Sequence, residues 1–134
     1  MIFLLQSILE NFFNIQYVEN FCKRCNKQKS HKKNIKLASP PEILILNLQR
    51  YNKKQIKNES LVEFDEIIDL SNFIDYDFGY QDETVYNLFG IINDYGNIKS
   101  DHYNCCIKLF NKDWYEFNDN SINKINFKDL MKCK

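Results

Sequence analysis

One of the chain's two histidines, His102, begins an apolar run, and a second such run ends at Asn118 and Asp119. A polar turn at residues 111–113 separates the runs, so an antiparallel hairpin would bring the start of the first beside the end of the second. If even-numbered residues pair with even-numbered ones, His102 and Asn118 also share a face of the sheet. An imidazole whose second nitrogen is held by an amide or carboxylate acceptor is a competent general base. The alternative is a surface histidine beside ordinary turn residues.

The candidate metal ligands are Cys22 and Cys25, which form a single C-x-x-C in a basic stretch. Such a pair is half of a tetrahedral zinc site, because structural zinc takes four ligands. His31 could add a third ligand, although a histidine in a lysine-rich loop is more often simply solvated. We expect structural zinc in a completed domain and only a half site in this chain.

The cysteine count and the N-terminal run indicate the cellular compartment to expect. Five cysteines, of which Cys105 and Cys106 are adjacent, suit a reducing environment better than a disulfide framework, so we expect a cytoplasmic or nuclear protein. The opening run MIFLLQSILENFF has no basic flank and is interrupted by Glu10, which argues against a signal peptide or a membrane span.

The 18 basic and 18 acidic residues cancel, so no overall charge favours a nucleic-acid or membrane partner. The charges are nevertheless segregated. Residues 23–57 hold eleven Lys or Arg and one acid, whereas residues 59–94 hold ten acids and no Lys or Arg. This pattern is typical of two solvated faces, and it also permits a small C-x-x-C interaction module whose basic stretch binds an acidic partner.

The apolar pattern predicts an α+β fold. Leu5, Ile8, Leu9 and Phe12 have the spacing of an amphipathic helix. Residues 42–51 have the length and composition of a buried strand, and shorter strands are expected within 61–70 and 85–94. A long surface loop over 72–84, the hairpin after residue 101 and a short helix near 128–131 complete an arrangement of antiparallel strands with helices at the ends.

Five segments in order resemble the C-terminal half of the ubiquitin-specific protease catalytic domain, a papain-like thiol protease. They are LILNLQRY, VEFDEIIDL, YNLFGIINDYG, DHYNCCI and WYEFNDNSI. The family's patterns read roughly P-x-I-L-x-x-x-L-x-R-F, V-x-F-x-x-x-x-D-L, Y-x-L-x-x-V-I-x-H-x-G, G-H-Y and W-Y-x-F-[ND]-D-x-x-V. The resemblance implies that residues 1–134 form one partial domain, comprising the antiparallel palm, part of the fingers and an N-terminal helix.

The resemblance also implies roles for the hairpin residues. By position, His102 matches the catalytic histidine, Asn118 the third member of the triad and Asp119 the neighbouring acid. Tyr103, Trp114 and Phe117 match packing positions and are expected in the core. The implied reaction is hydrolysis of the peptide or isopeptide bond after the C-terminal glycine of ubiquitin, through an acyl-enzyme and without a catalytic cofactor.

The family's nucleophile lies in a G-x-x-N-x-G-N-T-C-Y-type segment, and these 134 residues contain nothing like it. Cys105 and Cys106 match ordinary strand positions, so neither is expected to replace it. The expected partners are therefore ubiquitin or a ubiquitinated protein, together with an upstream segment or chain that carries the cysteine. The alternative is a catalytically inactive remnant that binds ubiquitin or serves as a scaffold.

Three departures from the family pattern affect the site. Asp101 stands where glycine usually precedes the histidine, and Asp94 stands where the family often has histidine. The family's last strand, an A-Y-x-L-F-Y pattern, is not found after Cys133, which would leave a sheet edge unpaired. Asp94 and Asp101 are candidates for contacts with the arginines of the ubiquitin tail, with solvated surface acids as the alternative.

Overall fold

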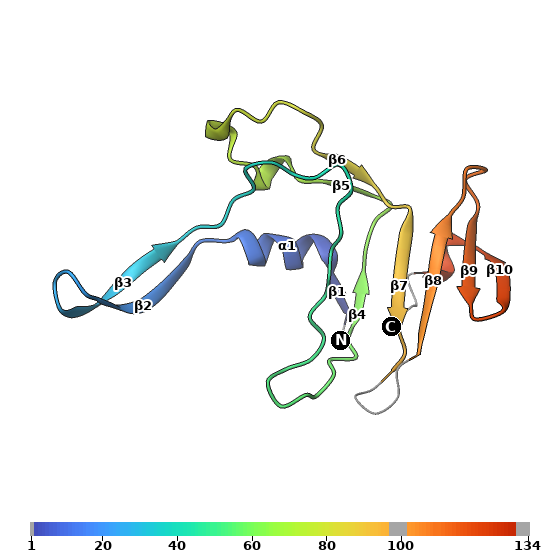
Figure 1. Ribbon diagram of the computed structural model, residues 1–134, viewed down its shortest axis with the longest axis horizontal. Helices are drawn as coiled ribbons and strands as arrows, with labels where there is room; N and C mark the ends of the chain where they lie inside the picture. The colour runs from blue at the N-terminus through green and yellow to red at the C-terminus, as the bar shows by residue number, and fades with distance from the viewer. Residues whose placement is uncertain (1, 97–101, 131–134) are drawn as a thin grey trace.

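The protein is described by a computed structural model over residues 2–96 and 102–130. The molecule is elongated, with a long hairpin at one end, a helix in the middle and a four-stranded sheet at the other end (Figure 1). The strands are mostly antiparallel and the helices few. The predicted α+β class is therefore confirmed.

The N-terminal helix α1 spans Leu5–Phe13, as its apolar spacing predicts. It follows a short strand, β1 (Ile2–Leu4), which pairs in parallel with β4 (Leu61–Glu63). Leu9 is buried, and the Phe13 ring stacks on Phe73 with 4.6 Å between centroids. Phe12, which the spacing placed on the buried face, is exposed instead.

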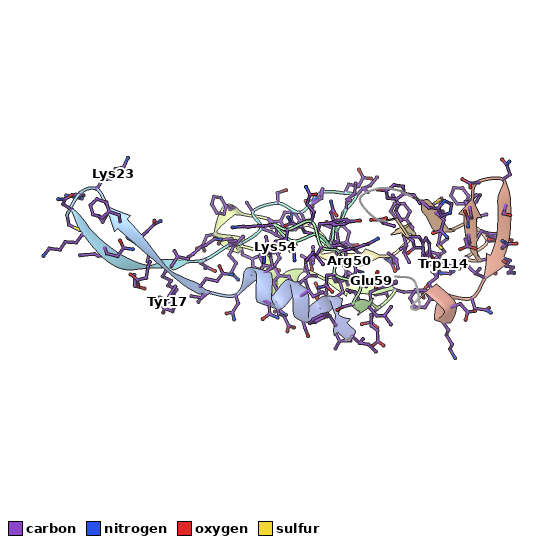
Figure 2. All side chains as sticks on the ribbon, turned by 90° about the horizontal axis from the view of Figure 1, so that it is seen from below. Tyr17, Lys23, Arg50, Lys54, Glu59 and Trp114 are labelled. Atoms are coloured by element: carbon purple, nitrogen blue, oxygen red, sulfur yellow. The ribbon has the colours of Figure 1, made fainter. Side chains whose placement is uncertain are left out.

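Strands β2 (Gln16–Cys22) and β3 (Lys27–Lys33) form the projecting hairpin. Seven residue pairs are in register, from Gln16 opposite Lys33 to Cys22 opposite Lys27. Asn26 closes the turn with a φ of 52°, a left-handed conformation that asparagine tolerates well. Every residue of β3 is exposed, so this hairpin is a solvated basic arm, on which Tyr17 and Lys23 lie (Figure 2).

The prediction of a buried strand over residues 42–51 is wrong. The run is irregular, with a single bridge between Tyr51 and Lys57, and Ile45 is 83% exposed. A strand depends on a neighbour for its hydrogen-bond ladder, and within the described residues no strand pairs with this run. Leu44 packs against the cluster around Leu9, Leu70 and Phe73, but Ile43, Ile45 and Leu46 remain exposed in the described part of the chain.

Residues 67–87 contain a small antiparallel pair around a long loop. Strand β5 (Ile67–Asp69) pairs with β6 (Val85–Asn87), and the predicted loop between them holds two short 3-10 turns, η1 (Ser71–Phe73) and η2 (Tyr76–Phe78). Leu70 and Phe73 are buried against Leu9 of α1. This is the first of two apolar clusters in the molecule.

The four-stranded sheet has the order β10-β9-β8-β7, with every neighbouring pair antiparallel. Its strands are β7 (Gly90–Asp94), β8 (Tyr103–Lys108), β9 (Trp114–Asn118) and β10 (Ser121–Ile125). The short helix α2 (Phe127–Leu130) follows. The turn expected at residues 111–113 is present, with Lys112 at a φ of 65°. Strand β10 had not been separated from β9 by sequence reasoning.

The two faces of this sheet differ sharply in burial. One face carries the second apolar cluster, in which Cys106, Trp114 and Leu130 are buried. The opposite face carries a continuous apolar row across all four strands, made by the cross-strand pairs that link Ile92, Cys105, Phe117 and Ile122. Ile92 and Ile122 are 78% and 63% exposed, whereas Cys105 and Phe117 between them are half-buried, so the described residues cover this row only in part.

Glu66 ties the sheet to the rest of the chain. Its Oε1 accepts hydrogen bonds from Trp114 Nε1 and Lys108 Nζ, both at 3.2 Å, and its carbonyl accepts from the Leu88 N–H at 2.7 Å. The Trp114 N–H, and then the Lys108 ammonium, lower the pKa of Glu66 below its ordinary 4.5. The charged form of Glu66 is therefore favoured by folding.

This contact predicts an acid dependence of stability. Because the folded pKa of Glu66 lies below the unfolded one, its contribution is complete above about pH 4.5 and is lost as the pH falls through the folded value. Glu66→Gln should weaken the dependence of the unfolding free energy on pH in this acid range. Urea unfolding followed by fluorescence of Trp114, the one tryptophan, measures it. The exposed Glu59→Gln is the control, and an equal effect there would contradict the assignment.

Candidate active site

The structure brings His102 and Asn118 together. The Nε2–H of His102 donates to Asn118 Oδ1 at 2.9 Å, across the hairpin that joins β8 to β9. Because an amide oxygen can only accept, this contact selects the tautomer with its proton on Nε2 and leaves the Nδ1 lone pair to take up a proton. His102 is exposed, so the ring is accessible from solvent.

The register of the hairpin explains the contact. Cys106 lies opposite Glu116 and Lys108 opposite Trp114, so even-numbered residues pair with even-numbered ones, as one of the two alternatives in the sequence required. His102 precedes β8 by one residue and Asn118 ends β9. The turn at Lys112 thus determines that both side chains lie on the same face and at the same end of the sheet.

A buried polar network lies on that same face, next to the pair. Asn93 Nδ2 donates to Asn104 Oδ1 at 2.9 Å, and Asn104 Nδ2 donates to Glu116 Oε1 at 2.7 Å. Asn93 and Asn104 are buried, and the Asn93 amide also contacts Cys106 Sγ at 3.7 Å. The network links β7, β8 and β9 where His102 and Asn118 are attached, which restricts relative movement of the strands.

The other predicted hairpin residues differ in burial and in their contacts. Asp119 lies in the turn after β9 with a φ of 50° and is exposed, and within the described residues no hydrogen bond joins it to His102. Trp114 is buried, as expected of a core position, whereas Phe117 is half-buried in the apolar row of the opposite face and belongs to neither core cluster. Tyr103 is 55% exposed, so its assignment to the core is wrong. Its side chain lies on the sheet face opposite to the buried cluster, because it is odd-numbered in β8.

The backbone next to His102 is fixed from β7. The Tyr95 N–H donates to the His102 carbonyl at 2.9 Å, and the two rings lie 6.4 Å apart. Asp94 is already engaged, since Oδ1 accepts from the Gly96 N–H at 2.8 Å and Oδ2 lies 3.2 Å from Lys57 Nζ. The other acid suggested for the ubiquitin tail, Asp101, lies outside the described residues.

The C-x-x-C lies at the tip of the β2–β3 hairpin, with Cys22 half-buried and Cys25 exposed. The Cys25 backbone N–H and then its side chain lower the pKa of the Cys22 thiol, which favours the thiolate that metal ions bind. His31 pairs with Val18, four residues along β3 from the position opposite Cys22, or about 13 Å. It is therefore not a third ligand, and the described residues offer two of the four ligands that zinc requires.

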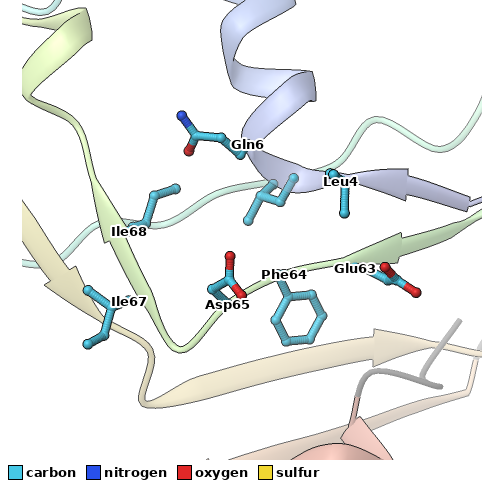
Figure 3. A pocket seen from close by; sticks show the side chains of 8 residues that line it. Leu4, Gln6, Glu63, Phe64, Asp65, Ile67 and Ile68 are labelled. Atoms are coloured by element: carbon cyan, nitrogen blue, oxygen red, sulfur yellow. The ribbon is translucent and has the colours of Figure 1, made fainter.

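Other features lie away from the histidine. A shallow pocket between the start of α1 and the β4–β5 segment is lined by Leu4, Phe64 and Ile68 among others, and by neither His102 nor Asn118 (Figure 3). Cys106 is buried, and Cys105 lies half-buried in the apolar row of the opposite face. Among the described helices, none is long and apolar enough to cross a membrane.

Comparison with known proteins shows the family to which this chain belongs. The model of the family described as ubiquitin carboxyl-terminal hydrolase matches residues 5–132. The chain belongs to the ubiquitin carboxyl-terminal hydrolase family. The predicted resemblance to ubiquitin-specific proteases is thus confirmed, and with it the assignment to a hydrolase family of the ubiquitin system.

Individual members of the ubiquitin carboxyl-terminal hydrolase family are distant and much longer. Ubiquitin carboxyl-terminal hydrolase 5 of Arabidopsis thaliana is 30% identical over 82% of this chain, and the match covers 12% of that protein. Ubiquitin carboxyl-terminal hydrolase 8 of Saccharomyces cerevisiae is 23% identical over 96% of this chain and 30% of its own length.

The fold agrees with solved structures of the family. The Ubp8 deubiquitinating module of SAGA, solved bound to ubiquitin aldehyde, superposes with a TM-score of 0.78 at 22% identity. The superposition covers 98% of this chain and 31% of that one. The chain therefore spans less than a third of the lengths of the yeast relatives it matches.

Proposed function

We propose that this chain supplies the histidine half of a deubiquitinating thiol protease, with His102 as general base and Asn118 as the residue that orients it. The observation that carries the proposal is the 2.9 Å hydrogen bond from His102 Nε2 to Asn118 Oδ1. This is the arrangement that a thiol protease requires, because it presents Nδ1 to an incoming thiol. Asp119 is included as a nearby acid, in the turn after β9, whose negative charge would favour the imidazolium form of His102.

In the proposed reaction His102 Nδ1 takes the proton of a cysteine thiol, and the thiolate attacks the carbonyl carbon of the scissile bond. The resulting imidazolium is stabilised through its Nε2–H bond to Asn118. The imidazolium then donates its proton to the departing amine as the carbon–nitrogen bond breaks, leaving a thioester. His102 next removes a proton from water, whose oxygen attacks the thioester; as the carbon–sulfur bond breaks, the imidazolium returns this proton to the sulfur, and the carboxylic acid is released and loses its proton to solvent.

The nucleophilic cysteine is proposed to come from a segment outside these 134 residues, in the same or another polypeptide. The surface of the chain supports this. Its accessible area is 10891 Å², whereas a compact monomer of 16.2 kDa exposes about 7,400 Å². The excess includes the apolar row on the four-stranded sheet and the exposed run around Ile43 and Ile45, both of which suit burial against further protein.

Ubiquitin or a ubiquitinated protein is the proposed substrate, and cleavage is proposed after the C-terminal glycine of ubiquitin. Support comes from family membership and from the solved relative bound to ubiquitin aldehyde. Cys22 and Cys25 would supply two thiolates to a structural zinc whose remaining ligands come from outside the chain. A reducing compartment such as cytoplasm or nucleus is proposed, because within the described residues no disulfide joins Cys22, Cys25, Cys105 or Cys106.

A chimaera tests the proposal. In it, this chain replaces the matching segment of the yeast ubiquitin carboxyl-terminal hydrolase 8, which retains the rest of its own sequence. We expect the chimaera to release a fluorophore from the C-terminus of ubiquitin and the isolated chain to release none. Thiol-dependent turnover by the isolated chain would contradict the placement of the nucleophile. A folded chimaera that binds ubiquitin without cleaving it would favour the inactive scaffold.

A further inference from the structure

Lys57 lies in a part of the chain far from His102 in sequence, yet its ammonium reaches the strand end next to that histidine. Lys57 Nζ donates to the Asp94 carbonyl at 2.7 Å and to the Gly96 carbonyl at 2.8 Å. It also lies 3.2 Å from Asp94 Oδ2. These three oxygens match the three N–H donors of an ammonium group, so the cation is fully satisfied by the end of β7 and the turn after it.

The Lys57 side chain is itself held in place. Residues Tyr51 and Lys57 form an antiparallel bridge, and Nζ lies 5.9 Å from the centre of the Tyr51 ring. The turn between them is fastened by Asn52, whose Oδ1 accepts from the backbone N–H groups of Lys54 and Ile56 at 2.9 and 3.0 Å. The Lys57 side chain is only 17% exposed, so this is an ordered contact and not a loose surface ion pair.

The segment that Lys57 holds is the one against which His102 is fastened. Asp94 pairs with Tyr103, and the Tyr95 N–H donates to the His102 carbonyl at 2.9 Å. Asp94 Oδ1 also accepts from the Gly96 N–H, which closes residues 94–96 into a tight turn. Movement of this turn would therefore shift the backbone of His102 relative to Asn118.

We propose that Lys57 is a positioning residue that maintains the His102–Asn118 hydrogen bond by anchoring the end of β7; this inference rests on the proposed function of that pair. The chemistry of the contact requires lysine. An arginine at this position keeps the charge, but its planar donors cannot converge on three oxygens around one point, and methionine has no donor. A lost anchor would free residues 94–96 and allow the imidazole to sample its other tautomer.

The test is spectroscopic and independent of cleavage. The chain has two histidines, so the ring ¹⁵N signals of His102 can be assigned against His31. At about pH 8, where imidazole is neutral, wild type should show His102 mainly with its proton on Nε2. In Lys57→Met the ¹⁵N shifts should move towards a mixture of tautomers. Exchange of the Tyr95 amide proton should become at least about tenfold faster, while amides of the β9–β10 pair keep their rates.

Two further variants give the test its controls. Lys54→Met removes the same charge from an exposed position in the same loop and should leave both signals unchanged (Figure 2). Lys57→Arg keeps the charge but not the three convergent donors, so its His102 tautomer and Tyr95 amide exchange should change as in Lys57→Met. If the methionine variant unfolds, the arginine variant tests the inference in its place. Wild-type tautomer and exchange in both Lys57 variants, or an equal change in Lys54→Met, would overturn the inference.

Kinetics of the chimaera separate this inference from the proposed function. Lys57→Met is expected to lower kcat by about twofold to fivefold, no more than loss of the His102–Asn118 hydrogen bond itself, and to change KM by less than about twofold, since orientation and not binding is affected. An inactive wild-type chimaera would count against the proposed function alone, because the ring spectra of the isolated chain would still report on Lys57.

Discussion

Replacing His102 by alanine in the chimaera is expected to reduce kcat for cleavage of a ubiquitin C-terminal fluorogenic substrate by on the order of ten-thousandfold. Without the imidazole, the cysteine thiol supplied by the yeast part of the chimaera would lose the base that deprotonates it, and the leaving amine would lose the acid that protonates it. The KM should change little, because ubiquitin is bound over a surface far larger than one ring. Steady-state kinetics at neutral pH measure both constants.

Asn118 provides the graded control for this prediction. Asn118→Ala removes one hydrogen bond of about 1 kcal/mol and should lower kcat by roughly fivefold. Asn118→Asp restores an acceptor at 2.9 Å from Nε2 and should recover much of the rate. A His102→Ala chimaera that retains more than about a tenth of wild-type activity would show that another group is the base.

Truncating Trp114 is expected to produce the largest loss of stability in the sheet that carries the site. The indole is buried, its ring lies 5.8 Å from that of Phe127, and its Nε1 donates to Glu66. Trp114→Ala should therefore lower the free energy of unfolding by about 3–5 kcal/mol, from lost burial and from the cavity left between β9 and α2. Urea denaturation followed by far-ultraviolet circular dichroism measures the loss.

The matched variant for Trp114 is phenylalanine. Trp114→Phe retains most of the buried ring and removes only the hydrogen bond to Glu66, so we expect a loss of about 1 kcal/mol. Equal losses in the two variants would mean that the polar link, and not packing on Phe127 and Leu130, stabilises this end of the molecule. No loss in either would contradict the burial of this side chain.

The hairpin around His102 could be predicted because its determinants are local. The turn near Lys112 and the alternation along two adjacent runs are visible in the sequence, and they leave only the parity of pairing open. With even–even pairing, Asn104 and Glu116 could also have been placed on the face of His102. The family resemblance added the roles, which no pattern of apolar residues contains.

Other parts could not be predicted, since they depend on distant or external partners. The run 42–51 has the composition of a buried strand, but a strand also needs a neighbour, and the described chain offers none at that place. Lys57 reaches backbone carbonyls 37 and 39 residues away, and carbonyls leave no mark in a sequence. Tyr103 was assigned to the core, but its face of the sheet is covered only in part by the described residues.

The two apolar clusters, one around Leu9, Leu70 and Phe73 and the other around Cys106, Trp114 and Leu130, share no buried residue. Each cluster can therefore be a unit that opens locally with its own free energy, which amide hydrogen exchange would resolve. Trp114 fluorescence follows only the unit that carries His102. The basic arm formed by β2 and β3 contributes to neither cluster, so its sequence can change without disturbing them.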